Sequence, residues 1–372
     1  MSGDSNFKLI GLAIISLIFL GLYVAFERDN WKSLQPGATE ITAARLMAEA
    51  TEVVSSCQKS SGIAPEDNKF DINRTGLIGL EHSPLTTTLG NLEAKRTTCN
   101  PAMAALLVYL LKEAGVRRGE VVALGASASF PALIIAAYSA ARALDLELLA
   151  IISVGASQWG ANNPEFSWLD MEDCLRRAGF SRQRLLAVAW GGEDDSGSEY
   201  PDELKERLVK KASQLGLSFL PGGSLEERVR VHLDLFQRAA GRRRIKAFIN
   251  IGGSSVNLGS DSSILKLEPG LARVKHIPPA GRRGLIQEMA ARSVPVIHLL
   301  NIRRLAETYG LPWDPRPLPP ASIPALKVAG SPPGSKRLLI LYAGYLTAIF
   351  IWLILAGIIR KKRGWRALRT DS

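Results

Sequence analysis

The amino-acid sequence predicts an α/β fold: a mostly parallel, doubly wound sheet with helices on both faces, flanked by one transmembrane helix at each terminus. Three observations support this prediction. Short aliphatic runs alternate with amphipathic helical patterns through the centre of the chain. Turns rich in Gly and Ser separate the runs from the helical patterns. Two long runs without Asp, Glu, Lys or Arg lie near the two chain ends.

The first long apolar run covers residues 9–26. At about 1.5 Å per residue, a helix of this length crosses a hydrocarbon core roughly 30 Å thick. A cleaved signal peptide and a buried core helix are the alternatives. A signal peptide ends in a small-x-small cleavage site, whereas this run ends in Tyr-Val-Ala-Phe-Glu-Arg. We therefore predict an uncleaved membrane anchor.

The second long apolar run, residues 338–359, stops at the four consecutive basic residues 360–363. Basic residues beside a membrane helix favour the cytoplasmic side, so the tail, residues 360–372, is predicted to be cytoplasmic. Two crossings then place the N-terminus in the cytoplasm as well. The sequence thus predicts a protein of the inner (plasma) membrane, with a domain at residues 37–311 outside the cytoplasm.

The alternation inside the domain gives individual elements. The predicted strands are residues 121–125, 148–154, 185–190, 247–251 and 294–300. The predicted helices are residues 43–57, 102–114, 131–144, 168–178, 201–215, 225–240 and 285–292. Residues 312–337 are rich in Pro, which predicts an extended spacer without regular structure before the second membrane helix.

Charge and cysteine usage exclude some classes of function. The chain has 372 residues and a net charge of +11, but more than half of that charge lies after residue 335, so nucleic acid is not an expected partner. The basic clusters at residues 242–246, 282–283 and 303–304 are either solvated surface or sites that attract a polyanion. The three cysteines and four histidines match no metal spacing, so no metal site is predicted, and the cofactor is unknown. One disulfide is compatible with a location outside the cytoplasm, but the sequence does not select the pair.

Ligands of open parallel sheets bind beyond the carboxyl ends of the strands, so the loops there are the candidate site. Residues 125–131 form a small-residue turn with Ser127 and Ser129 before a helix that starts at Pro131. Such a turn is an anion cradle, a nucleophile site or only a tight structural turn. A nucleophile elbow would require Gly at position 129, which this sequence lacks.

Other loops add polar side chains and backbone N–H groups. The acidic turn with Glu193, Asp194 and Asp195 is either solvated or able to hold a cation or act as acid and base. The segment at residues 86–101 is either a capped turn or a site for a carboxylated ligand, and the loops at residues 153–164 and 250–259 read as ligand-facing. The predicted ligand-binding residues are Thr86, Thr87, Thr88, Lys95, Arg96, Ser127, Ser129, Ser157, Gln158, Trp159, Asn162, Ser254, Ser255 and Asn257.

Five segments follow one another along the chain: LIGLEHSPLTTTLGNLEAKRTTCNP, ALGASASFPAL, SVGASQWGANNPEFSWLDME, AWGGEDDSG and NIGGSSVNLG. In this order they resemble the poly-gamma-glutamate system protein family (PgsW), over roughly residues 76–259 and including the terminal membrane helices. The resemblance implies association with the bacterial machinery that makes or exports poly-γ-glutamate, alongside its ligase and membrane subunits. It implies no established reaction, so no catalytic residue is carried over.

Three functions are expected from these features. The first is a membrane-anchored accessory protein of capsule synthesis or export that binds the anionic polymer or the synthase subunits. The second is a hydrolase or transferase of γ-glutamyl bonds, with Ser127 or Ser129 as nucleophile or with Glu193, Asp194 and Asp195 as acid, base or metal ligands. The third is a non-catalytic scaffold for the synthase subunits. A polar pocket at one sheet edge is expected for the first two functions and not for the third.

Overall fold

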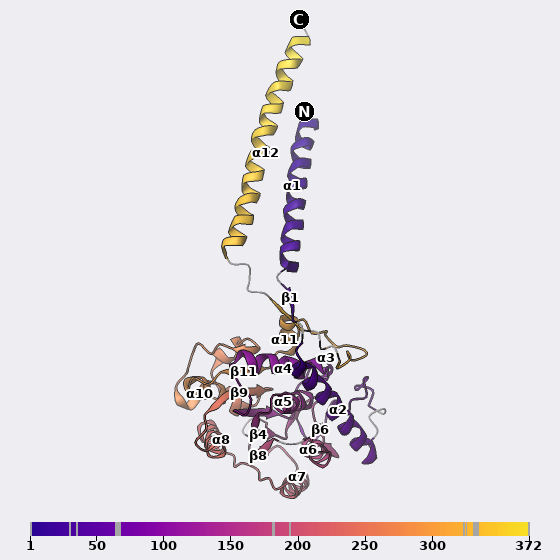
Figure 1. Ribbon diagram of the computed structural model, residues 1–372, viewed down its shortest axis with the longest axis vertical. Helices are drawn as coiled ribbons and strands as arrows, with labels where there is room; N and C mark the ends of the chain where they lie inside the picture. Colours follow the sequence, from indigo (N-terminus) through magenta and orange to yellow (C-terminus); the bar gives the residue numbers. More distant parts are fainter. Residues whose placement is uncertain are drawn as a thin grey trace. The chain divides into compact units, whose positions relative to one another are not determined.

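A computed structural model describes residues 2–29, 31–34, 36–63, 68–180, 183–192, 195–322, 324, 326–329 and 335–370. The chain divides into two compact units. One unit is Gln35–Leu326, and the other combines Met1–Leu34 with Lys327–Ser372. Figure 1 shows the course of the chain through both units.

The larger unit is built on a six-stranded sheet with the strand order β10-β11-β9-β3-β4-β8. All neighbours are parallel except β10 and β11, which are antiparallel. The strands are β3 (Val121–Ser127), β4 (Glu147–Ser153), β8 (Arg184–Ala189), β9 (Ile245–Ile251), β10 (Gly270–Ala272) and β11 (Val296–Leu299). The predicted α/β fold with a mostly parallel sheet is confirmed, and each predicted strand overlaps an observed one. The three-residue edge strand β10 was not predicted, because it is too short to show a periodic pattern.

The strand order reverses direction at β3. The chain runs from β3 to β4 and β8 on one side, and later returns to place β9 and β11 on the other side of β3. The connection after β3 therefore leads to β4 on one side of β3, whereas the connection after β9 leads to β11 on the other side. A crevice at the carboxyl ends of the strands is the usual ligand position at such a reversal.

Helices surround this sheet. The seven predicted helices are confirmed as α2 (Ala38–Ser60), α4 (Ala102–Glu113), α5 (Pro131–Ala143), α6 (Trp168–Arg177), α7 (Asp202–Gln214), α8 (Leu225–Ala240) and α10 (Leu285–Ala291). The further elements are α3 (Leu92–Thr98), α9 (Ser255–Leu258), α11 (Ile302–Tyr309), two 3-10 helices at Ser262–Lys266 and Ala280–Arg282, and the strands β2 (Thr86–Thr88), β5 (Ala156–Ser157), β6 (Asn162–Asn163) and β7 (Phe166–Ser167). Outside the main sheet, β2 pairs with β5, and β6 pairs with β7.

The core explains why these segments adopt these structures. On one face of the sheet, Val121 and Ala123 of β3 pack in a cluster with Phe236 of α8 and Ile286 of α10. Successive side chains of a strand point to opposite faces. Because Val122 and Leu124 are also completely buried, the opposite face of β3 is covered as well. Burial on both faces accounts for the continuous apolar runs in the sequence.

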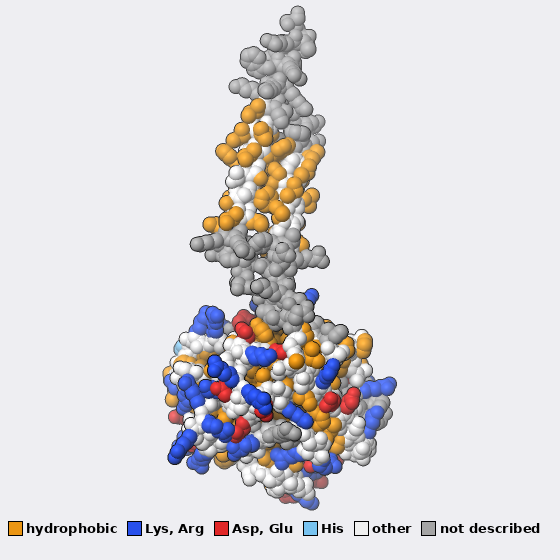
Figure 2. All heavy atoms as spheres, in the orientation of Figure 1, with side chains coloured by type: hydrophobic (Ala, Val, Ile, Leu, Met, Phe, Trp, Pro, Cys, Tyr) orange, Lys and Arg blue, Asp and Glu red, His pale blue; other side chains and the backbone are white. Residues whose placement is uncertain are grey.

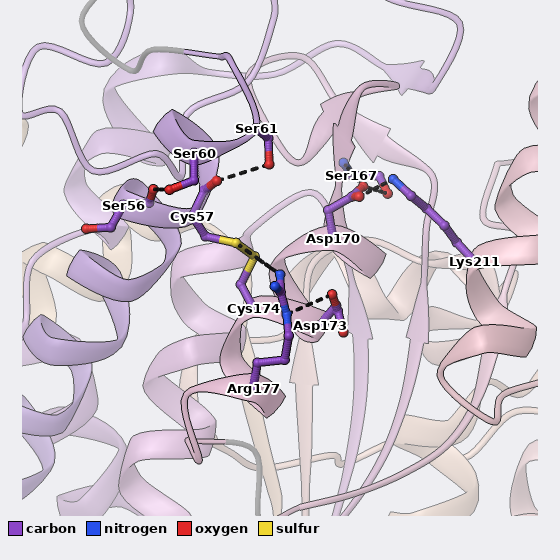
Figure 3. The surroundings of a disulfide bond; sticks show 10 residues. All are labelled: Ser56, Cys57, Ser60, Ser61, Ser167, Asp170, Asp173, Cys174, Arg177 and Lys211. Atoms are coloured by element: carbon purple, nitrogen blue, oxygen red, sulfur yellow. Dashed lines mark hydrogen bonds and ion pairs between the residues drawn. A yellow bond between two sulfur atoms is a disulfide. The ribbon is translucent and has the colours of Figure 1, made fainter.

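A disulfide joins Cys57 of α2 to Cys174 of α6, across 117 residues of chain (Figure 3). The third cysteine, Cys99, is a buried free thiol. The structure therefore selects the pair that the sequence left open. A bridge that closes a loop of this length reduces the conformational freedom of the unfolded chain, and it stabilises the folded domain mainly for that reason.

The smaller unit contains α1 (Ser2–Asp29), β1 (Trp31–Leu34), the strand β12 (Leu326–Ala329) from its second residue onward, and α12 (Ser335–Thr370). The two helices lie side by side and antiparallel, so that both chain ends are at the same end of the pair (Figure 1). Ser16 and Tyr345 share a hydrogen bond of 3.0 Å between their hydroxyls, and the rings of Phe19 and Tyr345 are 5.3 Å apart.

The helix pair carries exposed apolar side chains (Figure 2). Among the described residues, one segment, Leu339–Ile358, is long and apolar enough to be a candidate membrane span by length and composition. The apolar part of α1, Leu9–Val24, is shorter. The predicted C-terminal span thus has a matching helix, whereas a second span at residues 9–26 stays a prediction.

The Pro-rich segment at residues 312–337 differs from the spacer that its composition predicts. Its first part packs on the larger unit, because the Asp314 carboxylate accepts hydrogen bonds of 2.6 and 2.8 Å from the Arg96 guanidinium. The carbonyl of Pro315 also accepts a hydrogen bond of 3.1 Å from Asn73. Farther on, Leu326–Ala329 forms strand β12, which pairs with β1. Residues 323, 325 and 330–334 lie outside the described residues.

Candidate functional site

A pocket of ≈ 400 Å³ lies at the carboxyl edge of the sheet, beside the reversal of strand order. The ends of β3 and β4 and the loops after β8 and β9 line it, and the segment from β2 to α3 forms a further wall. Hydroxyl and glycine residues dominate the lining. They include Thr87, Thr88, Asn91, Lys95, Ser127, Ser129, Phe130, Ser153, Gly155, Ser157, Gly191, Gly192, Gly253 and Ser254.

Lys95 is the basic residue of this lining. The start of its helix, α3, is fixed by Asn91, whose side chain accepts a hydrogen bond of 2.7 Å from the backbone N–H of Ala94. Lys95 is only 2% exposed. Its Nζ donates to the backbone carbonyl of Ser129 and to Ser157 Oγ at 2.6 Å. It also lies 3.8 Å from the centroid of the Phe130 ring, close enough for a cation–π contact.

The surroundings of Lys95 decide its protonation. Removal from water disfavours the charged form and lowers the pKa of Lys95 to about 7. Within the described part of the chain, Lys95 forms no ion pair, and its polar partners are the neutral groups of Ser129 and Ser157. The amine therefore changes protonation state near neutral pH, which an exposed lysine does not do.

Three serines continue the network from Lys95. Ser157 donates its backbone N–H to Ser129 Oγ at 2.9 Å. The hydroxyls of Ser129 and Ser127 are 2.8 Å apart, and the Ser127 hydroxyl donates to the carbonyl of Gly155 at 3.3 Å. The loops after β3 and β4 are thus joined by side-chain hydrogen bonds directly beside the pocket.

Glycines allow these loops to approach one another. A Cβ at Gly160 would lie 2.9 Å from Ser129 Cα, which no ordinary packing permits. Gly252, after β9, has a φ of +80° and lies close to Ser127, where a Cβ would meet the Ser127 side chain at 3.1 Å. The small residues at the carboxyl edge are therefore required by the packing of the serine loops.

Several predicted site residues make contacts away from this pocket. Arg96 follows Lys95 in the chain, but its guanidinium is held by Asp314. Asn162 is fully buried and bridges two segments, because its amide donates to the Leu80 carbonyl and to Thr86 Oγ1, each at 2.8 Å. These contacts hold the β2 segment against the loop after β4.

The remaining predicted polar residues lie near the pocket but are not in its lining. Gln158 accepts a hydrogen bond of 3.0 Å from the N–H of Gly90 and contacts His82. The Trp159 ring packs edge-on against the Phe70 ring. The Ser255 hydroxyl accepts a hydrogen bond of 3.1 Å from the Arg228 guanidinium. The Asn257 side chain lies against Gly125. Of the predicted residues, the pocket brings together Thr87, Thr88, Lys95, Ser127, Ser129, Ser157 and Ser254.

The acidic turn offers less to a ligand than its sequence suggests. Asp195 is 4% exposed, and its carboxylate accepts a hydrogen bond from the backbone N–H of Gly191, so it holds the turn. Glu193 and Asp194 lie outside the described residues.

Two of the predicted basic clusters contain residues in ion pairs. Arg243 pairs with Glu147 at 2.5 Å, and Arg282 pairs with Asp261 at 3.1 Å.

Phe130 is a pocket residue that the sequence reasoning missed. It is the single aromatic side chain in a loop of small residues, and this contrast is the signal that could have identified it. The depth of Lys95 and its contact with Ser157 had no signal in the sequence, since they depend on residues 62 positions apart.

Comparisons with known protein families, with curated proteins and with solved structures find no match for this chain.

Proposed function

We propose that the protein is a membrane-anchored accessory protein of poly-γ-glutamate synthesis or export, and that its pocket binds carboxylates of the anionic polymer. One observation carries the proposal: a lysine at the pocket wall is buried without an ion pair among the described residues. A ligand carboxylate beside Lys95 would supply the missing negative charge and favour the ammonium form. The choice of this polymer rests on the order of motifs that resembles the poly-gamma-glutamate system family.

The lining suits this kind of ligand. Thr88 and Ser254 line the pocket with hydroxyls that can donate to a ligand, whereas the hydroxyl of Thr87 donates to the Ala156 carbonyl at 3.4 Å. A γ-glutamyl chain presents one free carboxylate per residue on a flexible backbone. One carboxylate in the pocket would pair with Lys95, and neighbouring carboxylates would meet basic side chains on the outer surface of the larger unit.

The convergence of polar loops favours a binding protein over a simple scaffold. One pocket is lined by residues from the predicted loops at 125–131, 153–164 and 250–259, by Gly191 and Gly192 after β8, and by the β2–α3 segment. A scaffold that acts only through its helices needs no such arrangement. Contact with the synthase subunits remains part of the proposal, as the route by which the pocket meets nascent polymer.

We also propose that the larger unit is a doubly wound domain outside the cytoplasm, between two membrane-spanning helices. The Cys57–Cys174 disulfide supports this location, because disulfides persist in oxidising compartments and are rare in the cytosol. The antiparallel pair of α1 and α12 is compatible with both termini lying on the same side of the membrane.

Replacement of Lys95 tests the proposed binding. The full chain in detergent micelles is titrated with γ-linked glutamate oligomers by isothermal calorimetry. Lys95→Met keeps the length of the side chain and removes the charge, and we expect about 10- to 100-fold weaker binding, as for a lost hydrogen bond to a charged group. Lys210→Met, at an exposed position of α7, is the matched control and should bind like the unmodified protein. Equal affinity of the Lys95 variant and the control would refute the proposal.

The second candidate, a hydrolase or transferase of γ-glutamyl bonds, is favoured by the 2.6 Å distance between Ser157 Oγ and Lys95 Nζ.

A further inference from the structure

We infer that the pocket is also a catalytic site for acyl transfer, in which Ser157 is the nucleophile and Lys95 is its general base. The substrate class is an amide or ester whose own carboxylate, where it has one, does not contact Lys95 during the reaction, because that contact favours the ammonium form, which is not a base. The choice of a γ-glutamyl amide within that class rests on the proposed function. The inference stands on the position of one hydroxyl and one amine at the wall of the same pocket.

Counting hydrogens identifies the reactive serine among the three. A serine hydroxyl has one hydrogen to donate. The Ser127 hydroxyl donates to the Gly155 carbonyl, which is only an acceptor. In the pair with Ser127, it is therefore Ser129 that donates. Both hydroxyl hydrogens thus point away from Lys95.

Ser157 differs from the other two serines. Among the described residues, the hydrogen-bond partner of Ser157 Oγ is Lys95 Nζ. Its backbone N–H is held by Ser129 Oγ at 2.9 Å, which positions the residue. Ser157 is 7% exposed and lines the pocket, so a bound carbonyl can reach its hydroxyl. Ser129 is a positioning residue in this arrangement.

Lys95 meets the requirements of a base. One of its N–H groups is directed to the Ser129 carbonyl, and the amine also faces Ser157 Oγ. When neutral, the nitrogen lone pair accepts the Ser157 hydroxyl hydrogen. Burial lowers the pKa of Lys95 to about 7, so the neutral form is well populated at neutral pH. A base whose pKa is near the working pH is the efficient choice.

The reaction balances with these two groups and water. Ser157 Oγ forms a bond to the substrate carbonyl carbon, and its proton passes to Lys95 Nζ. The carbon–nitrogen bond then breaks, and Lys95 returns the proton to the leaving amine. Water attacks the resulting ester and gives one proton to Lys95. The bond between Ser157 Oγ and the acyl carbon breaks, and Lys95 protonates the serine again.

A fluorophosphonate probe tests the inference without any assumption about the substrate. The probe forms a phosphorus–oxygen bond with an activated serine and releases fluoride. The full chain in detergent micelles is incubated with the probe, and intact mass and peptide mapping locate the label. We expect one label, on Ser157, with a rate that rises with pH and has its midpoint near 7, the pKa of Lys95.

Variants separate the roles of the residues. Ser157→Ala should abolish labelling, and Lys95→Met should slow it at least about 100-fold, the usual contribution of a general base. Ser129→Ala should slow labelling less than about tenfold and leave the pH midpoint unchanged, since the base remains. Ser213→Ala, on the exposed face of α7, should react like the unmodified protein.

Three results would overturn the inference: no label, a label on Ser127 or Ser129, or a Lys95→Met variant that reacts at the unmodified rate. The calorimetric titration keeps the two proposals distinguishable. Ser157 labelling without binding of γ-linked oligomers would leave catalysis standing and refute polymer binding. Binding of γ-linked oligomers without labelling of Ser157 would leave polymer binding standing and refute catalysis. The chain length of poly-γ-glutamate after incubation then shows whether the polymer itself is cleaved.

Discussion

Lys95 is expected to lower the stability of the fold that holds it. An amine that is 2% exposed loses most of its hydration, and its neutral partners do not replace that hydration fully. An apolar side chain of the same length is often neutral or stabilising at such a position. A residue that weakens the folded state while lining a pocket fits a role in binding or catalysis better than a role in packing.

The pH dependence of stability tests this interpretation. In the unfolded chain the pKa of Lys95 is close to 10.5, and in the folded protein it is about 7. Between these values the unfolded state binds more protons, so stability rises with pH. Relative to Lys95→Met, the unmodified protein should gain roughly 1.4 kcal/mol of unfolding free energy per pH unit in this window. The measurement is denaturant unfolding of both proteins from pH 6 to pH 10.

Below pH 7 the Lys95 amine is charged in both the folded and the unfolded protein. The difference in unfolding free energy between the unmodified protein and Lys95→Met should therefore become constant there, with Lys95→Met the more stable of the two. The Lys210→Met control removes an exposed amine and measures the effect of a lysine-to-methionine replacement outside the pocket. A Lys95→Met difference that does not change with pH would mean that Lys95 keeps an ordinary pKa.

At the scale of elements, the disulfide joins α2 to α6, two helices of the larger unit whose bridged cysteines are 117 residues apart in sequence. Cys57 belongs to the first helix of this unit, whereas Cys174 follows strand β4 and the pocket loop after it. The β6–β7 hairpin lies between that loop and α6. The bridge therefore anchors the helix that follows the Ser157 loop, without touching the pocket lining itself.

Removal of the bridge should destabilise the domain. For the double variant Cys57→Ser with Cys174→Ser, we expect a loss of about 2–5 kcal/mol of unfolding free energy, because the unfolded chain regains the freedom of a long loop. Thermal unfolding with and without a reducing agent measures this effect. The unmodified protein and Cys99→Ser should both melt lower when reduced, whereas the double variant should not respond. A reducing agent that leaves the unmodified protein unchanged would contradict the bridge.

At the scale of the whole molecule, the membrane topology determines which compartment the pocket faces. The candidate span Leu339–Ile358 is followed by a basic tail, and basic residues favour the cytoplasmic side. If α1 also crosses the membrane, everything between the helices lies outside. The disulfide and the topology then require the same oxidising compartment.

A reporter enzyme that is active only outside the cytoplasm tests the topology. Fused after Pro333, it should be active, and fused after Ser372, it should be silent. The two fusions differ only by the C-terminal helix and its tail, so each serves as the control for the other. Activity in the second fusion alone would place the domain in the cytoplasm and would remove the basis for an extracytoplasmic polymer-binding site.

The sequence by itself determined the features that depend on local patterns. Five strands and seven helices follow from the periodicity of apolar residues, and the carboxyl-edge loops follow from the rule for parallel sheets. The tertiary structure decided which side chains meet. Lys95 and Arg96 are neighbours in sequence, yet one contacts Ser157, 62 positions away, and the other contacts Asp314, 218 positions away. Neighbouring residues on a helix point in different directions, and their partners come from other segments. Only the tertiary structure shows that Lys95 lines the pocket, whereas Arg96 is outside the lining and pairs with Asp314.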